Sequence, residues 1–393
     1  MQLVAYGAQD IYLTGNPQIT FFKVVYRRHT NFSMEAIQQT FNGNIAASSR
    51  ATTTISRNGD LVSRCYLEVI AGTLHANNDN NYGTQIIDNI VCEIGGQQID
   101  KHSGHFMETW FELTEPNPSG NSYLVVEADM AAAVTGGTSR TAPTLFQKTT
   151  CAGGVDSTGA APGTITVPLC FWFCRNPGLA LPLIALQYHE VKLIVTFSGA
   201  LNETAAKLWV DYIYLDTDER RRFAQVSHEY LIEQVQEQAG SADTTQDLNF
   251  NHPVKELVWT GAYTNDSSAA TSGIVQGPVM AYGSSDVNTI GLKLNGHDRF
   301  AARNTKYFTR TQIWQHHNGY GGVHGGQSDS IAVYSFALKP EEHQPSGTCN
   351  FSRIDNAQMI GTASPCPATG KIFAINYNVL RIMSGMGGLA YSN

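Results

Sequence analysis

Residues 32–39 read FSMEAIQQ, and residues 230–237 read YLIEQVQE. The second stretch repeats the first at an offset of 198 (230 − 32), so that Glu35 falls on Glu233 and Ile37 on Val235. Self-similarity over a long period has to be settled before any fold is assigned, because it shows that one structural unit occurs twice. These two stretches therefore predict that the chain contains two copies of one domain.

Three further matches occur in the same order in both halves of the chain. Each is short, but their common order favours tandem duplication over chance. They are CEIGGQQ (92–98) with LKLNGHD (292–298), which places Gly96 on Gly296; LPLIALQYHEV (181–191) with QPSGTCNFSRI (344–354), which places Val191 on Ile354; and LWVDYIYL (208–215) with FAINYNVL (373–380), which places Tyr212 on Tyr377.

The repeated unit has the pattern of an antiparallel β domain. Short runs that alternate apolar and polar residues, bounded by Gly, Asn, Pro and Ser, occur along the whole chain, whereas long amphipathic helix patterns are scarce. Domains of this size with long loops between strands favour jelly rolls over immunoglobulin-like sandwiches. We therefore predict an all-β fold with jelly rolls at 30–216 and 228–393. The insert-rich stretch 122–163, which the second copy lacks, is predicted to be an exposed loop with a strand or two.

The junction between the two copies reads DTDERRRFAQVS. Acidic residues at Asp218 and Glu219, followed by Arg220, Arg221 and Arg222, suit the charge preference of a helix from its amino end to its carboxyl end. We predict a short linking helix within residues 217–227.

Composition excludes several classes of protein. The 393 residues are 42% hydrophobic and 15% charged, with a formal net charge of −8, which argues against a nucleic-acid-binding surface covering the protein. The start lacks the pattern of a secretory signal, and the most apolar stretch, at 179–186, is far shorter than the roughly 20 residues of a membrane-spanning helix. The seven scattered cysteines are expected to be reduced thiols of an intracellular product.

The stretch SFALKPEEHQPSGTCNFSRIDNA (335–357) contains the residue types of a catalytic triad, namely His343, Cys349 and Asp355. A cysteine nucleophile needs a lowered thiol pKa and a converging base, and a strand–loop–strand arrangement supplies neither. We therefore interpret this stretch as structural and expect no catalytic residue.

Metal and redox sites are also not expected. His102 and His105 have a spacing that can bind zinc, but no cluster completes four ligands, so both are interpreted as surface or loop histidines. Cys170 and Cys174, in CFWFC, are interpreted as buried thiols on one face of a strand. No cofactor is predicted.

Four long motifs resemble one known family. They are LVAYGAQDIYLTGNPQITFFKVVYRRHTNFSME at the amino end, CFWFCRNPGLALPLIALQYHEVKL, DTDERRRFAQVSHEYLIEQVQ and FALKPEEHQPSGTCNFSRIDNA. Together they are similar to the major capsid proteins of nucleocytoplasmic large DNA viruses, and the resemblance runs nearly from end to end.

The resemblance implies a double jelly roll, with two eight-stranded sandwiches side by side, and a structural role. Such proteins form homotrimers of pseudo-hexagonal outline that tile an icosahedral shell. The implied partners are the chain itself, neighbouring capsomers, and minor capsid and penton proteins, with an inner membrane reached only through minor proteins and with no direct nucleic-acid contact. The implied location is the virion capsid, assembled in the host cytoplasm. Residues 1–29 would then be an N-terminal arm.

Two questions stay open at this point. The abundant Tyr and Trp residues and the long loops also suit a carbohydrate-binding or glycan-processing β-sandwich protein, an enzyme version of which would need a pair of carboxylates. The second question concerns the arginine cluster, Arg220 to Arg222. We expect it to fix the two jelly rolls against each other or against a neighbouring subunit by pairing with acids, for which Glu341 and Glu342 are candidates.

Overall fold

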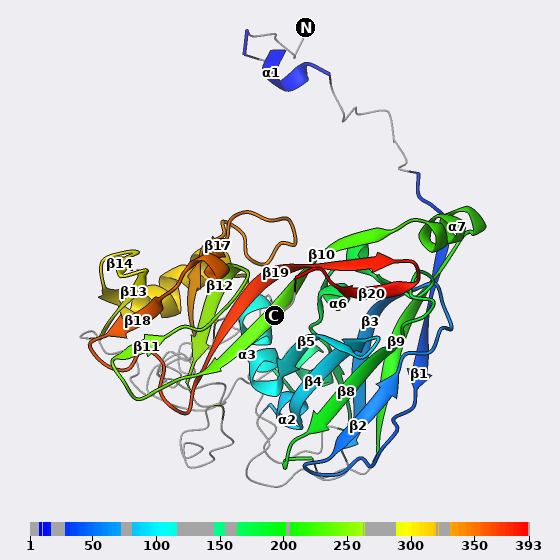
Figure 1. Ribbon diagram of the computed structural model, residues 1–393, viewed down its shortest axis with the longest axis horizontal. Coiled ribbons are helices and arrows are strands. Elements are labelled where there is room, and N and C mark those ends of the chain that lie inside the picture. Colours follow the sequence, from blue (N-terminus) through cyan, green and yellow to red (C-terminus); the bar gives the residue numbers. More distant parts are fainter. Residues whose placement is uncertain are drawn as a thin grey trace, which may run out of the picture.

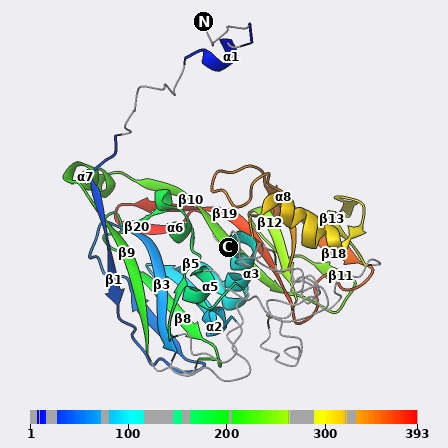
Figure 2. The same cartoon turned by 180° about the vertical axis from the view of Figure 1, so that it is seen from behind.

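The computed structural model describes residues 8–9, 11–16, 28–71, 81–115, 145–153, 163–201, 205–261, 263, 288–319, 321 and 331–391. Two β-sandwiches lie side by side, and α3 lies between them in both views (Figures 1 and 2). Most of the predicted arm and most of residues 122–163 lie outside the described residues.

The first sandwich consists of two antiparallel sheets. One has the order β1 (Phe32–Gln39), β9 (Ala206–Leu215), β3 (Leu61–Ala71), β6 (Gly163–Pro168), with β7 (Leu181–Pro182) on β3. The other has the order β2 (Arg50–Thr54), β8 (Val191–Phe197), β4 (Ile87–Ile94), β5 (Gln97–Ser103).

The second sandwich repeats this arrangement. One sheet has the order β10 (His228–Ala239), β19 (Lys371–Met383), β12 (Pro253–Thr260), β16 (Ile331–Ser335), with β17 (Cys349–Asn350) on β12 and β20 (Met386–Leu389) on β19. The other has the order β11 (Thr245–Asp247), β18 (Ala357–Gly361), β13 (Thr289–Leu294), β14 (His297–Asp298), with β15 (Arg303–Asn304) on β13.

Helices occupy the connections between strands. They are α1 (Ile11–Thr14), α2 (Tyr82–Gln85), α3 (Gly104–Thr114), α5 (Leu145–Thr150), α6 (Trp172–Arg175), α7 (Thr217–Gln225) and α8 (Gln312–His316), with the 3-10 turns η2 (Pro177–Leu179) and η5 (Phe351–Arg353) and the π-helix η4 (Tyr307–Thr311).

Both sandwiches have jelly-roll topology. When the eight principal strands of each half are counted in chain order, both halves give sheets of order 1-8-3-6 and 2-7-4-5. The predicted double jelly roll is therefore confirmed.

Strand register confirms three of the four sequence matches. The pairing of Glu35 and of Glu233 tests the first and the last match together. Glu35 lies opposite Tyr212 in the first copy, and Glu233 lies opposite Tyr377 in the second. The third confirmed match is the glycine turn. Gly96 (φ 86°) closes the β4–β5 hairpin and Gly296 (φ 79°) closes the β13–β14 hairpin, in a left-handed conformation that glycine adopts without strain.

The remaining match, 181–191 with 344–354, aligns the correct parts of the two copies but is shifted by three residues. Ile94 pairs with Val191 in the first copy, and its counterpart Leu294 pairs with Ala357 in the second. The true offset is therefore 166 (357 − 191) rather than the predicted 163. The 3-10 turn η5 lies just before β18, and such an irregular segment leaves no alternating pattern by which register can be fixed.

Two local predictions can be compared directly with the structure. The linking helix is confirmed as α7, which begins after Asp216, has Asp218 and Glu219 in its first turn and Arg222 in its last, and buries no residue. Within 122–163, the described residues 145–150 form the helix α5 rather than an exposed loop or strand, and Gln147 and Thr150 of this helix are buried.

The hydrophobic core continues from one jelly roll into the other. Ile232, Val258 and Phe373 of the second jelly roll belong to the same buried cluster as the core of the first, whereas Leu257 and Trp259 face the separate core of the second. Adjacent residues of a strand point to opposite faces, so the sheet containing β12 and β19 is buried on both faces. This shared sheet positions the site described next.

Candidate functional site

A chain of buried and partly buried charges lies on and beside the shared sheet. We call it the charged joint. Its members are Arg175, Glu233, Lys255, Glu256, His317 and Glu341.

Glu233 is the centre of the first half of the charged joint. It lies on β10, and one carboxylate oxygen accepts a hydrogen bond from Arg175 Nη1 of the first jelly roll at 2.9 Å. The other oxygen lies 2.8 Å from Lys255 Nζ, whose side chain is fully buried. A carboxylate that is removed from water is stable only when it is paired in this way. Glu233 therefore ties the two jelly rolls together.

Arg175 is held in position by its own jelly roll. It ends α6, its Nε donates to the Cys170 carbonyl at 2.6 Å, and its guanidinium lies 4.5 Å from the centre of the Trp110 ring. Its side chain is 18% exposed, so the pair with Glu233 is largely shielded from water. The planar guanidinium suits this combined task, because it can stack on a ring and donate to a carboxylate at once.

A β-bulge places two neighbouring charges of β12. The pairing of β12 with β19 shifts between Val254 and Glu256, so Lys255 is the extra residue. Lys255 then reaches Glu233, while Glu256 reaches His317. Bulges commonly redirect side chains in this way. In the first jelly roll β3 has a bulge at a similar place, between Val62 and Arg64.

His317 bridges two carboxylates. Its Nε2 lies 3.0 Å from Glu256 Oε2 and its Nδ1 lies 3.0 Å from Glu341 Oε1. Burial alone would lower the pKa of His317, but the charges of Glu256 and Glu341 outweigh it and raise the pKa to about 9. Burial would likewise raise the pKa of Glu256, and His317 reverses the effect, so that this pKa lies below its usual range. At neutral pH the pair is ionised.

Hydrogen bonds from uncharged donors to carboxylates complete the contact between the jelly rolls. Ser103 Oγ donates to Glu237 Oε2 at 2.6 Å, and the Val235 N–H donates to Asp100 Oδ1 at 3.2 Å. The edge strand β5 thus lies along β10. Covering an edge in this way removes unpaired backbone groups that would otherwise invite aggregation.

The prediction for His102 and His105 as surface residues was wrong. Both are buried, because β5 and α3 lie between the jelly rolls. His102 pairs with Asp100 at 2.8 Å, and its ring stacks on Phe171. His105 Nε2 lies 2.6 Å from the Thr260 hydroxyl across the interface. Burial and the positive charge of Lys371 lower the pKa of His105 to about 3, so it is neutral.

The predicted contact residues have separate partners in the structure. Arg220 Nε lies 2.9 Å from Asp60 of the first jelly roll, and all three arginines of α7 are exposed. Glu341 pairs with His317, and Glu342 forms an exposed pair with Lys339. In the described part of the chain, the arginine that binds an acid of the other jelly roll is Arg175.

The residues of the rejected triad each have a structural partner. His343 Nδ1 lies 3.9 Å from Glu233. Cys349 of β17 lies opposite Val254 of β12 in the sheet, and the Asp355 N–H donates to Asn295 Oδ1. Among the described residues, no three His, Cys, Asp or Glu side chains gather into a metal-binding group. No helix in the described part of the chain is long and apolar enough to span a membrane.

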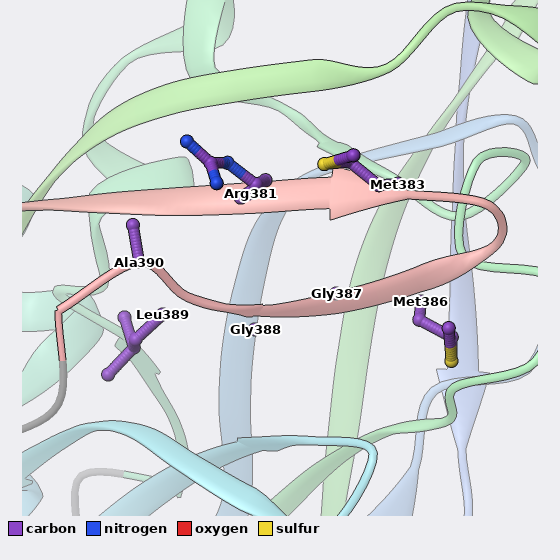
Figure 3. A pocket seen from close by; sticks show the side chains of 7 residues that line it. All are labelled: Arg381, Met383, Met386, Gly387, Gly388, Leu389 and Ala390. Atoms are coloured by element: carbon purple, nitrogen blue, oxygen red, sulfur yellow. The ribbon is translucent and has the colours of Figure 1, made fainter.

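A shallow pocket lies on the hairpin formed by β19 and β20 (Figure 3). Its lining runs from Arg381 to Ala390 and includes Met383 and Met386. Arg381 is its one charged lining residue, so the pocket lacks the two carboxylates that glycoside hydrolysis requires. It does not support the glycan-processing alternative.

The fold is a double jelly roll, and the charged joint connects its two halves through Glu233. Comparison with known families gives the same class. The model of the family described as "Major capsid protein N-terminus" matches residues 20–216, and that of "Large eukaryotic DNA virus major capsid protein" matches residues 219–388.

Relatives that align over their whole length support this result. The chain is 49% identical to the major capsid protein of Pyramimonas orientalis virus, covering 100% of this chain and 99% of that protein. It is 41% identical to the major capsid protein of Paramecium bursaria Chlorella virus 1, with the same coverage. The chain belongs to the family of major capsid proteins of large eukaryotic DNA viruses, and it is a structural component of the virion capsid.

Solved structures agree with this assignment. A chain of the quasi-atomic PBCV-1 virus capsid matches with a TM-score of 0.71 and 36% identity, covering 95% of this chain and all of that one. The Faustovirus major capsid protein shares the fold at a TM-score of 0.62 with 12% identity.

Removing Arg175 tests the charged joint. We expect Arg175→Ala to lower the free energy of unfolding by about 3–5 kcal/mol, because Glu233 would remain buried without its arginine partner. Denaturant unfolding of the purified protein measures this value. The matched control is Lys339→Ala, which breaks the exposed pair with Glu342 and should cost about 0–1 kcal/mol. Equal losses in the two variants would show that the joint contributes no more than a surface pair.

The second half of the joint predicts a dependence of stability on pH. The pKa of His317 is raised on folding from 6.5 to about 9, so its contribution is complete below pH 6.5 and is lost as the pH rises towards 9, by about 1.4 kcal/mol per pH step at most. The lowered pKa of Glu256 contributes above about pH 4.5 and is lost below it. Melting temperatures measured from pH 5 to 9.5 should therefore fall on the alkaline side.

The His317→Gln variant should lose this alkaline decline, whereas His316→Gln should retain it. His316 is the adjacent residue but is only partly buried and bonds the Leu338 carbonyl. The same alkaline slope in wild type and His317→Gln would contradict the assignment.

Proposed function

We propose that the chain forms homotrimers of pseudo-hexagonal outline that tile the icosahedral shell of a large double-stranded DNA virus. The observation that carries the proposal is the shared sheet, which joins two jelly rolls of equal topology side by side. A rigid pair of similar domains gives a three-fold assembly six similar corners, which suits hexagonal packing.

The proposed partners and location follow from this role. The trimer would contact neighbouring capsomers, minor capsid proteins and penton proteins, and would reach an inner membrane only through minor proteins. Assembly would take place in the host cytoplasm. We also propose that the chain performs no catalysis and binds no nucleic acid directly, in keeping with its acidic balance.

The proposed domain division is an arm at 1–29, jelly rolls at 30–216 and 228–393, and a linker at 217–227. The two family matches, which end at residue 216 and begin at 219, support the position of the linker. So does the exposed helix α7 between β9 and β10.

We further propose that the exposed arginines of α7 serve contacts between subunits. Arg221 and Arg222 are exposed on a helix that buries none of its residues, so they contribute little to the fold of one chain. Guanidinium groups are well suited to pair with carboxylates of a neighbour. Glu342, which is exposed on the second jelly roll, is one acid that a neighbour offers.

Native mass measurement tests the assembly. The wild-type protein should appear as a trimer, and the variant with Arg220, Arg221 and Arg222 all replaced by alanine should dissociate at lower concentrations of salt or denaturant. Its monomer should lose about 1–3 kcal/mol of unfolding free energy, because Arg220 pairs with the buried carboxylate of Asp60.

A matched control replaces Lys192 and Lys207 by alanine, since Lys192 forms an exposed pair with Glu190 and Lys207 a partly exposed pair with Glu68 on the first jelly roll. A wild-type monomer would overturn the proposed trimer. A triple variant whose trimer is as stable as that of the wild type would contradict only the role proposed for the arginine cluster, and the proposed trimer would stand.

A further inference from the structure

The contact between the two jelly rolls of one chain joins two different surfaces. Strand five of the first jelly roll, β5, lies along strand one of the second, β10, where Ser103 and Val235 form hydrogen bonds across the boundary. The helix α3, which joins strands five and six, packs on the same sheet, with the Phe106 ring 5.4 Å from the Phe373 ring. Because the copies meet head to tail, each copy has a surface of each kind.

The helix α6 belongs to the strand-five side of this contact. It follows strand six, and Arg175 at its end binds Glu233 of β10. The sequence predicted that Cys170 and Cys174 lie on one strand, which was wrong, because residues 172–175 form this helix. The first jelly roll therefore covers the second with β5, α3 and α6.

The corresponding surfaces of the other kind stay uncovered within one chain. In the second jelly roll, strand five is β14, α8 lies between strands five and six, and residues 336–348 follow strand six. We call these three segments the covering face. In the first jelly roll, strand one is β1. The strand β1 lies at one end of the molecule and the covering face lies at the other, so the two cannot meet within one chain (Figures 1 and 2).

Large apolar side chains are exposed on the covering face. Trp314 of α8 is 81% exposed, and Leu338 is 77% exposed. His316 Nδ1 lies 3.2 Å from the Leu338 carbonyl oxygen, so the two segments adjoin. In the first jelly roll, by contrast, Phe106 of α3 and Trp172 of α6 are buried. Apolar groups that are exposed together in this way mark an interaction surface.

The strand β1 exposes apolar side chains as well. Phe32 is 56% exposed and Met34 is 53% exposed. Gln39 is buried, and side chains an odd number of residues away along the strand point to the opposite face, so Phe32 and Met34 point away from the core. Ile232, which the sequence repeat aligns with Met34, is fully buried in the cluster shared with the first jelly roll. A second covering face would bury Met34 in the same way.

Charge also distinguishes the two surfaces. The segment 289–317, which includes β14 and α8, has one acidic residue, Asp298, among several basic ones: Lys293, Arg299, Arg303, Lys306 and Arg310. Residues 30–216 have more acidic than basic residues, and Glu35 of β1 is exposed. Complementary charges of this kind favour the head-to-tail pairing over the pairing of like surfaces.

We propose that the covering face of one copy binds the outward face of β1 in a second copy, with Trp314 and Leu338 packed near Phe32 and Met34. The contact inside each chain is then repeated between chains. Contacts of this head-to-tail kind close into a ring when the rotation allows it. The proposal rests on the proposed trimer and adds the surfaces by which the copies meet.

Photo-cross-linking of the full-length protein tests this pairing. We expect Trp314→p-benzoylphenylalanine, irradiated as the trimer and digested with trypsin, to be joined to the peptide 29–50 of another copy, which contains β1. The matched control is Leu145→p-benzoylphenylalanine, since Leu145 is also 81% exposed but belongs to neither surface, and it should not mark this peptide.

The outcomes separate the pairing from the trimer. A trimer in which position 314 is joined only to the second jelly roll of its neighbour would overturn the pairing and leave the trimer standing. A wild-type monomer would overturn both.

Two double variants provide a second measurement. Trp314→Ala with Leu338→Ala, and Phe32→Ala with Met34→Ala, should each raise the concentration at which the trimer dissociates by about tenfold or more, because each removes apolar anchors from one side of the contact. All four side chains are exposed in one chain, so the melting temperature of the monomer should not change. Leu145→Ala should leave dissociation unchanged. Wild-type dissociation of either double variant would contradict the proposal.

Discussion

The architecture depends on a sheet that is buried on both of its faces. In an ordinary jelly roll each sheet covers the core with one face and meets solvent with the other. In the second jelly roll the sheet of β10, β19, β12 and β16 covers its own core through Leu257 and Trp259 and packs against the first jelly roll through Val258 and Phe373. Polar groups that this second burial removes from water need partners, and the charged joint supplies them.

Duplication explains why both jelly rolls have the same strand order and register. Burial explains why the same strand position has different partners in the two copies. Glu35 and Glu233 occupy the same register position opposite Tyr212 and Tyr377. Glu35 is exposed and accepts a hydrogen bond from the Tyr214 hydroxyl, whereas Glu233 is 5% exposed and binds Arg175 and Lys255. One position of the repeated unit thus faces water in the first copy and forms the joint in the second. The C-terminal hairpin strengthens the same contact, since a Cβ on Gly387 would come within 2.6 Å of Leu186.

The sequence alone was sufficient for the fold and insufficient for the joint. Alternation, turn glycines and the matched order of segments specify local structure, and the paired registers of Glu35 and Glu233 follow from them. The partners of Glu233 do not, because Arg175 lies 58 residues away in a helical turn that carries no periodic signal. The same limit applies to His105, which reaches Thr260 across the contact between the two jelly rolls. The sequence places a glutamate at the same strand position in both copies, Glu35 and Glu233. Only the structure shows that the first is exposed and the second is buried.

Native-state hydrogen exchange tests most directly whether the two jelly rolls form one unit. The amides of β10, β12 and β19 should exchange only through global unfolding, with the same opening free energy as the amides of β3 and β8 in the first jelly roll, because the shared sheet cannot leave one core without opening the other. Exchange of the second jelly roll at a distinctly lower opening free energy, while β3 and β8 remain protected, would contradict the account.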